Sequence, residues 1–199
     1  MYFKFLLTLV LFCAPFIHSG HHEASEKAGL SEQEIIDIAM SAAPTNVSSK
    51  ATIIDSTGKV LRGGSNGWTC MPGTPPNDNV NPMCVDQAWQ KWLKAYMENT
   101  TYNSENESFG TSYMLVGDIA VDNDDPSNLD KSKGTWVAEG PHLMLLMPES
   151  LMSDLPTDPY AGGPYVMWKG SEFVHVMVPL ETTEPVSYTH LTLPTTPYV

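Results

Sequence analysis

The spacing of apolar residues predicts one helix near the start of the chain body and a second before its middle. Ser31 and Glu34 have the spacing of a capping box, and apolar residues then recur at helical intervals until Pro44. Another set of apolar and aromatic residues recurs with the same period up to Met97, and Pro82 suits the first turn of that helix. The sequence therefore places two main helices in the N-terminal half.

Extended segments and turn signals alternate between and after these helices. Residues 51–55 and 60–61 flank a Ser-Thr-Gly-Lys turn and predict a β-hairpin, whereas residues 63–81 are rich in Gly, Pro and Asn and predict a long ordered loop. Later strands are expected over residues 112–121, 135–147, 165–168 and 173–178. Early helices and late strands, joined by short connections, indicate an α+β fold whose antiparallel sheet is built mainly from the C-terminal half.

Both ends of the chain differ in character from its body. A lysine precedes an apolar run over residues 5–17 that is shorter than the roughly 20 residues of a membrane-spanning helix, and residues 1–19 are predicted to be a secretory signal peptide. Residues 186–199 resemble a translated sequencing adapter and are set aside as a non-native tail. The body, residues 20–185, has the length of one domain, and its expected location is periplasmic or secreted.

The chain is strongly acidic, with a formal net charge of -13 at pH 7. Nucleic acids and anionic membrane surfaces both attract basic proteins, so neither is expected as a partner. No membrane contact is expected once the signal peptide is removed. A small ligand or a metal ion is the kind of partner that remains, and the sequence gives no indication of the oligomeric state.

A pair of cysteines remains in the body once Cys13 is assigned to the signal peptide. We expect Cys70 and Cys84 to form a disulfide, because paired cysteines in an exported protein are more often bridged than metal-binding. Such a bridge would close the predicted loop and attach it to the second helix.

Apart from the histidines at its very start, the predicted domain has two histidines. Both occur in the same local pattern, His-x-Met. His142 is followed by Met144, and His175 is followed by Met177. Residues i and i+2 of a strand point to the same face, so each motif places an imidazole beside a thioether, and neighbouring strands would bring all four groups together. This donor set suits a soft ion, above all copper as Cu(I), in an oxidising exported setting. The sequence thus predicts a metal site at His142, Met144, His175 and Met177.

Two other interpretations of these histidines stay open. Methionine commonly fills cores, so both segments also fit ordinary half-buried strands that each contain one hydrogen-bonded histidine. In an exported enzyme, His142 or His175 would act as general acid or base, with a carboxylate such as Glu139, Asp118 or Glu172 fixing its tautomer. The sequence holds none of the familiar catalytic motifs that would favour this second alternative.

Two further segments have functional interpretations. Trp68, together with Trp136 or Trp168, is suited to the wall of a ligand pocket, and it is equally suited to a buried turn. Acidic residues are concentrated over positions 122–130, where Ca²⁺ would find oxygen ligands, but their spacing differs from that of an EF-hand and fits a solvated turn better.

Four segments of the body are distinctive enough to suggest a family. They read ATIIDSTGKVLRGGSNGWTCMP, NPMCVDQAW, GPHLMLLMP and GGPYVMWKGSEFVHVMVP. They resemble segments of an uncharacterised family of exported bacterial proteins, over most of residues 51–179. The resemblance implies export, and it adds no activity, cofactor or site residue to the hypotheses above.

Overall fold

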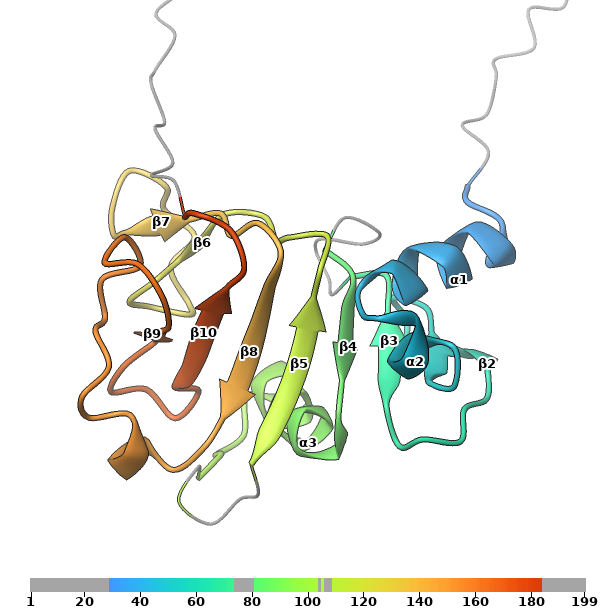
Figure 1. Cartoon of the computed structure of the whole chain (residues 1–199), viewed down its shortest axis with the longest axis horizontal. Coiled ribbons are helices and arrows are strands. Elements are labelled where there is room, and N and C mark those ends of the chain that lie inside the picture. The colour runs from blue at the N-terminus through green and yellow to red at the C-terminus, as the bar shows by residue number, and fades with distance from the viewer. Residues whose placement is uncertain (1–28, 74–80, 104, 106–108, 184–199) are drawn as a thin grey trace, which may run out of the picture.

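The computed structural model describes residues 29–73, 81–103, 105 and 109–183, so the predicted signal peptide and the adapter-like tail lie outside it. Within these residues the backbone forms three α-helices and ten β-strands (Figure 1). None of the described helices is both long enough and apolar enough to cross a membrane.

Helix α1 (Glu32–Ser41) begins with the predicted capping box. The Ser31 side chain accepts a hydrogen bond from the backbone N–H of Glu34, and the Glu34 carboxylate accepts one from the backbone N–H of Ser31 at 2.8 Å. The helix ends before Pro44, as predicted, and the single-turn helix α2 (Thr45–Ser48) follows.

Helix α3 (Gln87–Glu98) has a polar cap at each end. The Asp86 carboxylate accepts a hydrogen bond from the backbone N–H of Trp89 at 3.0 Å, and the helix ends at Asn99, which adopts the left-handed conformation that stops helices. Its buried face carries two tryptophans that pack against the sheet.

Eight strands form one sheet in the order β2-β1-β3-β4-β5-β8-β10-β9, and β6 and β7 form a separate ribbon (Figure 1). Neighbouring strands are antiparallel except for β1 and β3, which are parallel. A 3₁₀ turn over Glu149–Leu151 follows β8. The strands are β1 (Thr52–Ile54), β2 (Val60–Arg62), β3 (Thr69–Met71), β4 (Met83–Val85), β5 (Gly110–Met114), β6 (Val121–Asp122), β7 (Trp136–Val137), β8 (His142–Leu146), β9 (Tyr165–Met167) and β10 (His175–Pro179).

The α+β class and the largely antiparallel sheet are confirmed. The predicted hairpins also form, as β1 with β2 and as β9 with β10. Both long predicted strands are interrupted, the first after β5, near Gly117 with its φ of 94°, and the second between β7 and β8, where Pro141 stands.

Two strands occupy positions where the sequence predicted a loop and a helix start. Strand β3 lies inside the predicted loop, and β4 occupies residues 83–85, so α3 begins at Gln87 and not near Pro82. The reason is tertiary: β3 pairs with β1 and β4, and β4 pairs in turn with β5, so neighbouring backbones satisfy their hydrogen bonds. Local composition does not reveal pairing of this kind.

The disulfide between Cys70 and Cys84 is confirmed. The two residues lie directly opposite each other in the β3–β4 register, and both are fully buried beneath α1. The bridge therefore joins two neighbouring strands, whereas the sequence suggested that it would join a loop to a helix.

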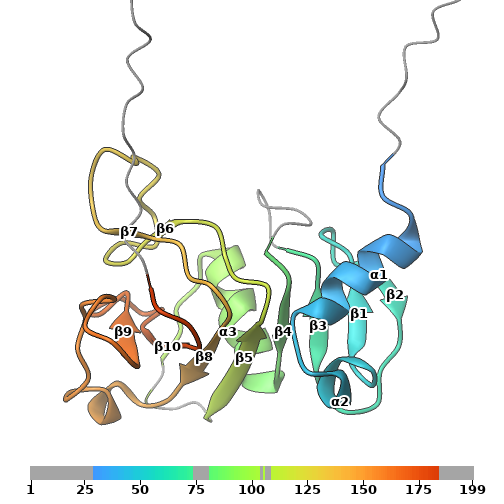
Figure 2. The ribbon, with the colours of Figure 1, turned by 45° about the horizontal axis from the view of Figure 1, so that its top comes forward.

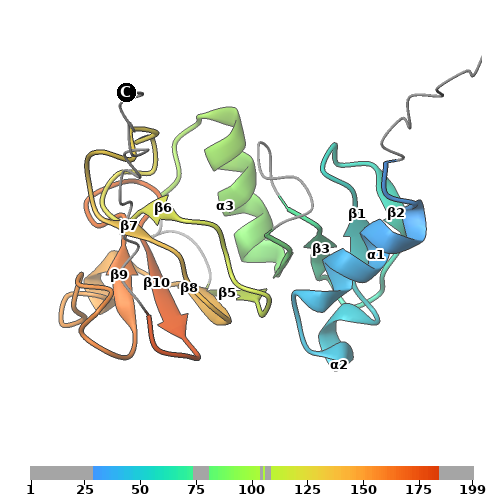
Figure 3. The same cartoon turned by 90° about the horizontal axis from the view of Figure 1, so that it is seen from above.

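The helices cover opposite faces of the sheet (Figure 2). Helix α1 packs on β1 and β3, and α3 packs on β4 and β5. The β6–β7 ribbon lies on the same side of the sheet as α3 (Figure 3). The largest hydrophobic cluster fills the α3 side, so this side holds the core beside which the candidate site lies.

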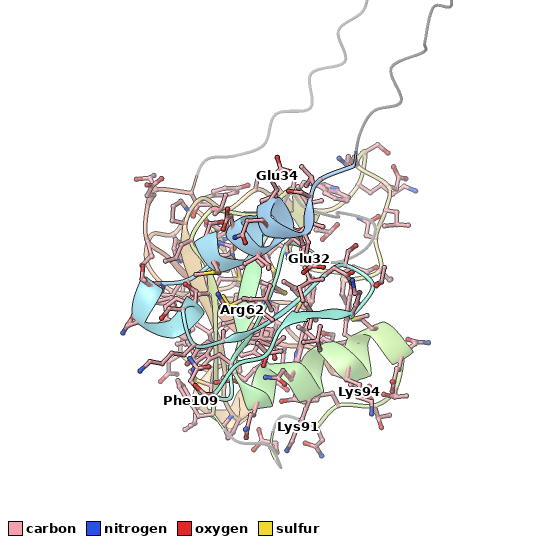
Figure 4. The ribbon with its side chains drawn as sticks, turned by 90° about the vertical axis from the view of Figure 1, so that its right-hand side faces the viewer. Glu32, Glu34, Arg62, Lys91, Lys94 and Phe109 are labelled. Carbon is pink, nitrogen blue, oxygen red and sulfur yellow. A yellow bond between two sulfur atoms is a disulfide. The ribbon has the colours of Figure 1, made fainter. Side chains whose placement is uncertain are left out.

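A single arginine joins α2 to the β1–β2 hairpin. Arg62, on β2, donates hydrogen bonds to the carbonyl oxygens of Ser48 and Ala51 at 2.7 and 3.3 Å. In Figure 4 it lies beneath α1, while Lys91 and Lys94 follow α3. These bonds fix the edge of the sheet that lies farthest from β9.

Candidate metal-binding site

A cavity of about 820 Å³ lies between the sheet, α3 and the β6–β7 ribbon. Strands β4, β5, β8, β9 and β10 contribute to one wall, and α3 contributes tryptophan and tyrosine side chains to another. The lining is mainly apolar with a few polar groups, which is the usual character of a ligand pocket. We refer to this cavity as the pocket.

The sheet face beneath α3 carries a broad group of methionines. The strand registers and the two-residue side-chain period place them all on this face, and all are buried in the same hydrophobic cluster. They come from six different strands: Met71, Met83, Met114, Met144, Met167 and Met177.

The first histidine belongs to a compact group on β5 and β8. His142 lies opposite Met114, and Met144, two residues further along β8, lies opposite Ser112. Residues directly opposite in an antiparallel pair have Cβ atoms about 4.5–5.5 Å apart. We call Ser112, Met114, His142 and Met144 the inner block.

The second histidine repeats this arrangement on β9 and β10. His175 lies opposite Met167, and Met177 lies opposite Tyr165. Each histidine therefore has one methionine across from it and another two residues along its own strand. We call Tyr165, Met167, His175 and Met177 the outer block.

The two blocks meet at a pair of methionines. Met144 of β8 lies directly opposite Met177 of β10. Strands β5, β8, β10 and β9 are consecutive and antiparallel (Figure 1). By their registers, a local two-fold axis at this methionine pair exchanges one block with the other. The register places His142 and His175 on opposite sides of the methionine pair, with one histidine at each end.

A backbone carbonyl sets the tautomer of each histidine. His142 Nδ1 lies 2.7 Å from the carbonyl oxygen of Gly140, and His175 Nδ1 lies 3.0 Å from that of Phe173. A carbonyl oxygen only accepts, so each Nδ1 donates, and the neutral ring keeps its lone pair on Nε2. Metal-binding histidines commonly donate their other ring N–H to a carbonyl in this way.

Burial lowers the pKa of both histidines. His142 is 0% exposed and His175 is 2% exposed. Desolvation lowers the pKa of His175 to about 4, although the Phe173 carbonyl acts in the opposite direction, and desolvation also lowers the pKa of His142. Both rings are therefore neutral at pH 7, and the neutral imidazole is the form that binds metals.

Three tryptophans surround His175. The rings of Trp89, Trp92 and Trp168 meet the imidazole at steep angles, with centroids 5.5, 5.6 and 5.0 Å away. Trp168 has a φ of 56°, which is unusual for a large residue, and hydrogen bonds from its backbone N–H and its indole N–H to carbonyls of Asn123 and Asp122 hold it there. The ribbon thus positions the ring over the histidine.

Carboxylates line another part of the pocket. Asn81 donates a hydrogen bond to Asp118 at 3.2 Å, and the Tyr165 hydroxyl donates one to Glu139 at 2.8 Å. Desolvation raises the pKa of Asp118 to about 6, so the group is mostly ionised at pH 7. Lys131 also lines the pocket. The acidic groups favour a cation over an anion in this space.

Several buried polar atoms on this side of the sheet have no hydrogen-bond partner among the described residues. They include His142 Nε2, Ser112 Oγ, and the indole nitrogens of Trp89 and Trp92. An unpaired buried polar group costs about 1–3 kcal/mol, so such groups often mark functional sites. His142 Nε2 is the atom that a metal ion would use.

Unfolding at different pH values tests the burial of His175. Below pH 6.5 the unfolded chain takes up a proton at this residue, and the folded protein does so only near pH 4, so His175 lowers stability as the pH falls. Relative to His175→Gln, the wild type is expected to lose about 2 kcal/mol between pH 7 and pH 5. Urea unfolding of both proteins measures the difference, and a difference that does not change with pH would contradict it.

The structure places the four predicted ligands on one face and brings Met144 and Met177 together. It keeps the histidines apart, and it adds Met114 and Met167, which the sequence reasoning missed because neither follows a histidine in the chain. Only the strand pairing reveals them.

The structure also bears on the catalytic, tryptophan and acidic-turn hypotheses drawn from the sequence. The histidine Nδ1 atoms bond to backbone carbonyls, whereas the general acid–base hypothesis expected Glu139, Asp118 or Glu172 in that place. Trp136 and Trp168 line the pocket, but Trp68 lines a separate hollow of about 360 Å³ with Lys91 and Phe109. In the acidic turn, Asp122 accepts hydrogen bonds from the backbone N–H groups of Asp124 and Asp125.

Over residues 29–73, 81–103, 105 and 109–183, no three His, Cys, Asp or Glu side chains converge as metal ligands. The two blocks offer a different donor set, one imidazole with two thioethers. No family model, curated protein or solved structure matches the chain.

Proposed function

We propose that this chain is an exported protein that binds a soft metal ion, Cu(I), at the His–Met face of the pocket. The observation that carries the proposal is the repeated block, in which a buried neutral histidine, its Nδ1 bonded to a backbone carbonyl, has a methionine opposite and another two residues along its strand. Export remains part of the proposal, and it rests on the apolar N-terminal segment and the disulfide.

The chemistry of the donors favours Cu(I) over harder ions. Thioether sulfur and imidazole nitrogen are soft or borderline ligands, whereas Mg²⁺ and Ca²⁺ prefer oxygen. All the donors are neutral, so the ion would bring one positive charge into a pocket whose carboxylates, such as Asp118 and Glu139, favour cations. The tryptophan rings packed around His175 help to bury its imidazole away from water.

An anaerobic Cu(I) titration against a chromophoric chelator tests the proposal. We expect the oxidised protein to compete with the chelator at a Kd below about 1 µM. His142→Gln/His175→Gln is expected to weaken binding at least about 100-fold, because losing a ligand costs more than losing its hydrogen-bond partner. Binding should change little between about pH 5.5 and pH 7.5, since at least the His175 ring stays neutral there, with its Nε2 unprotonated.

Met152→Leu is the matched control. Met152 is also fully buried, but it packs in the hydrophobic cluster of Val166 and Val176, away from both blocks. This variant is expected to bind Cu(I) like the wild type, since leucine conserves its volume. Circular dichroism checks that each variant folds, and Met167→Leu/Met177→Leu replaces the histidine pair if that variant does not. Wild-type binding no tighter than that of the double histidine variant would reject the proposal.

An exported enzyme with His142 or His175 as general acid or base is the alternative, and the geometry favours it less. A general base works best with a pKa near the operating pH, and the pKa of His175 is about 4. Each ring is also oriented by a carbonyl, which does not stabilise an imidazolium as a carboxylate does.

A further inference from the structure

The inner and outer blocks have the composition of two complete sites. In each, the histidine and its two methionines occupy adjacent register positions on two strands. One ion at the Met144–Met177 pair would be two residues, or roughly 7 Å along the strands, from either histidine position. An ion inside a block would instead lie between the histidine and its two methionines, nearer to the imidazole, so each histidine is better placed to share an ion with its own block.

The blocks differ in which of their side chains line the pocket. All three donors of the outer block line it, and so do both methionines of the inner block, Met114 and Met144, but His142 does not. His142 is 0% exposed, and its Nε2 has no hydrogen-bond partner among the described residues. An ion that comes from the pocket therefore meets every donor of the outer block directly, whereas at the inner block it must pass the methionines to reach the histidine.

We propose that the protein binds two Cu(I) ions per chain, one in each block, and that the outer block fills faster, because all three of its donors line the pocket. This inference rests on the proposed function. Binding at either block exchanges a neutral ligand of the incoming ion for a thioether or an imidazole on an ion that stays Cu(I), so it needs no electron or proton. The inner site would retain its ion longer, because its histidine lies away from the pocket.

Cu(I) titration of the full-length oxidised protein and of two single variants separates the sites. We expect two ions per wild-type chain, one per chain in His142→Gln, and one per chain in His175→Gln. His142→Gln should leave the affinity of the outer block within about threefold, since the blocks share no histidine. In stopped-flow mixing, the ion of His175→Gln, which retains the inner block, should load at least about tenfold more slowly than the ion of His142→Gln, which retains the outer block, because the inner histidine does not line the pocket.

Methyl NMR of [methyl-¹³C]methionine protein identifies which methionines bind in each variant. In His142→Gln the added ion should shift Met167 and Met177, and in His175→Gln it should shift Met114 and Met144, with each signal assigned by a Met→Leu variant. Met114→Leu replaces His142→Gln if that variant does not fold.

A wild-type chain that binds one ion would overturn the inference and leave the proposed function standing. This holds whether binding of that ion is lost in one of the two histidine variants or in both. Two ions per wild-type chain, with equal loading rates in His142→Gln and His175→Gln, would overturn the faster filling of the outer block. Absence of Cu(I) binding in the wild type would overturn the proposed function itself.

Discussion

Gly64→Ala is expected to lower the free energy of unfolding by about 3 kcal/mol or more, the upper range for overpacking a tight site. A Cβ atom on Gly64 would lie 2.2 Å from the backbone nitrogen of Thr52 and 2.4 Å from the carbonyl carbon of Ala51. These are backbone atoms at the start of β1, and Thr52 N–H donates to the Trp68 carbonyl at 2.9 Å, so they cannot move without breaking the pairing of β1 with β3.

Gly63→Ala is the matched control for this substitution. A Cβ atom on Gly63 would have no atom within 4 Å, so its replacement should change stability by no more than about 0.5 kcal/mol. Urea unfolding followed by tryptophan fluorescence measures both variants. Equal effects at the two positions would show that the close approach at Gly64 is not a constraint on folding.

Removing the disulfide is expected to cost about 3 kcal/mol, the loop-closure value for a bridge of this span. Cys70→Ala/Cys84→Ala tests this in urea, and the wild type with reducing agent provides an independent comparison. The bridge lies in the cluster beneath α1, on the face of the sheet opposite the inner and outer blocks.

The same variant also tests where the metal binds. Both cysteines are absent from the two blocks, so the double variant should take up as many Cu(I) ions as the oxidised wild type at a temperature where it is folded. A loss of Cu(I) binding in the double variant would mean that the cysteines contribute to the site, contrary to the proposed ligand set. An unchanged free energy of unfolding of Cys70→Ala/Cys84→Ala in urea would contradict the loop-closure argument.

The sequence predicted where helices and strands form better than it predicted which strands pair with each other. The capping box at Ser31 and the turn after β1 are local signals, and both produce the expected structure. Strands β3 and β4 have no such signal, because Gly, Pro and Asn dominate the surrounding chain, and these strands form only because they pair with neighbours.

The candidate site shows the same division. The two-residue strand period was enough to predict that His142 and Met144 share a face. It could not predict that Met114 would lie opposite His142, or that the β8–β10 register would place Met144 against Met177 and separate the histidines. Registers depend on turn geometry and on packing between distant segments, which no single motif encodes.

The methionine-rich face also makes the protein sensitive to oxidation of its methionine side chains. Thioethers convert to sulfoxides when oxidants reach them, and a sulfoxide is polar and bulkier and offers oxygen in place of soft sulfur. Met167 and Met177 line the pocket, so a small oxidant would reach them by way of this space. Trp92 and Trp168 stack against each other and line the same pocket, so their packing would set how easily an oxidant reaches the two sulfur atoms.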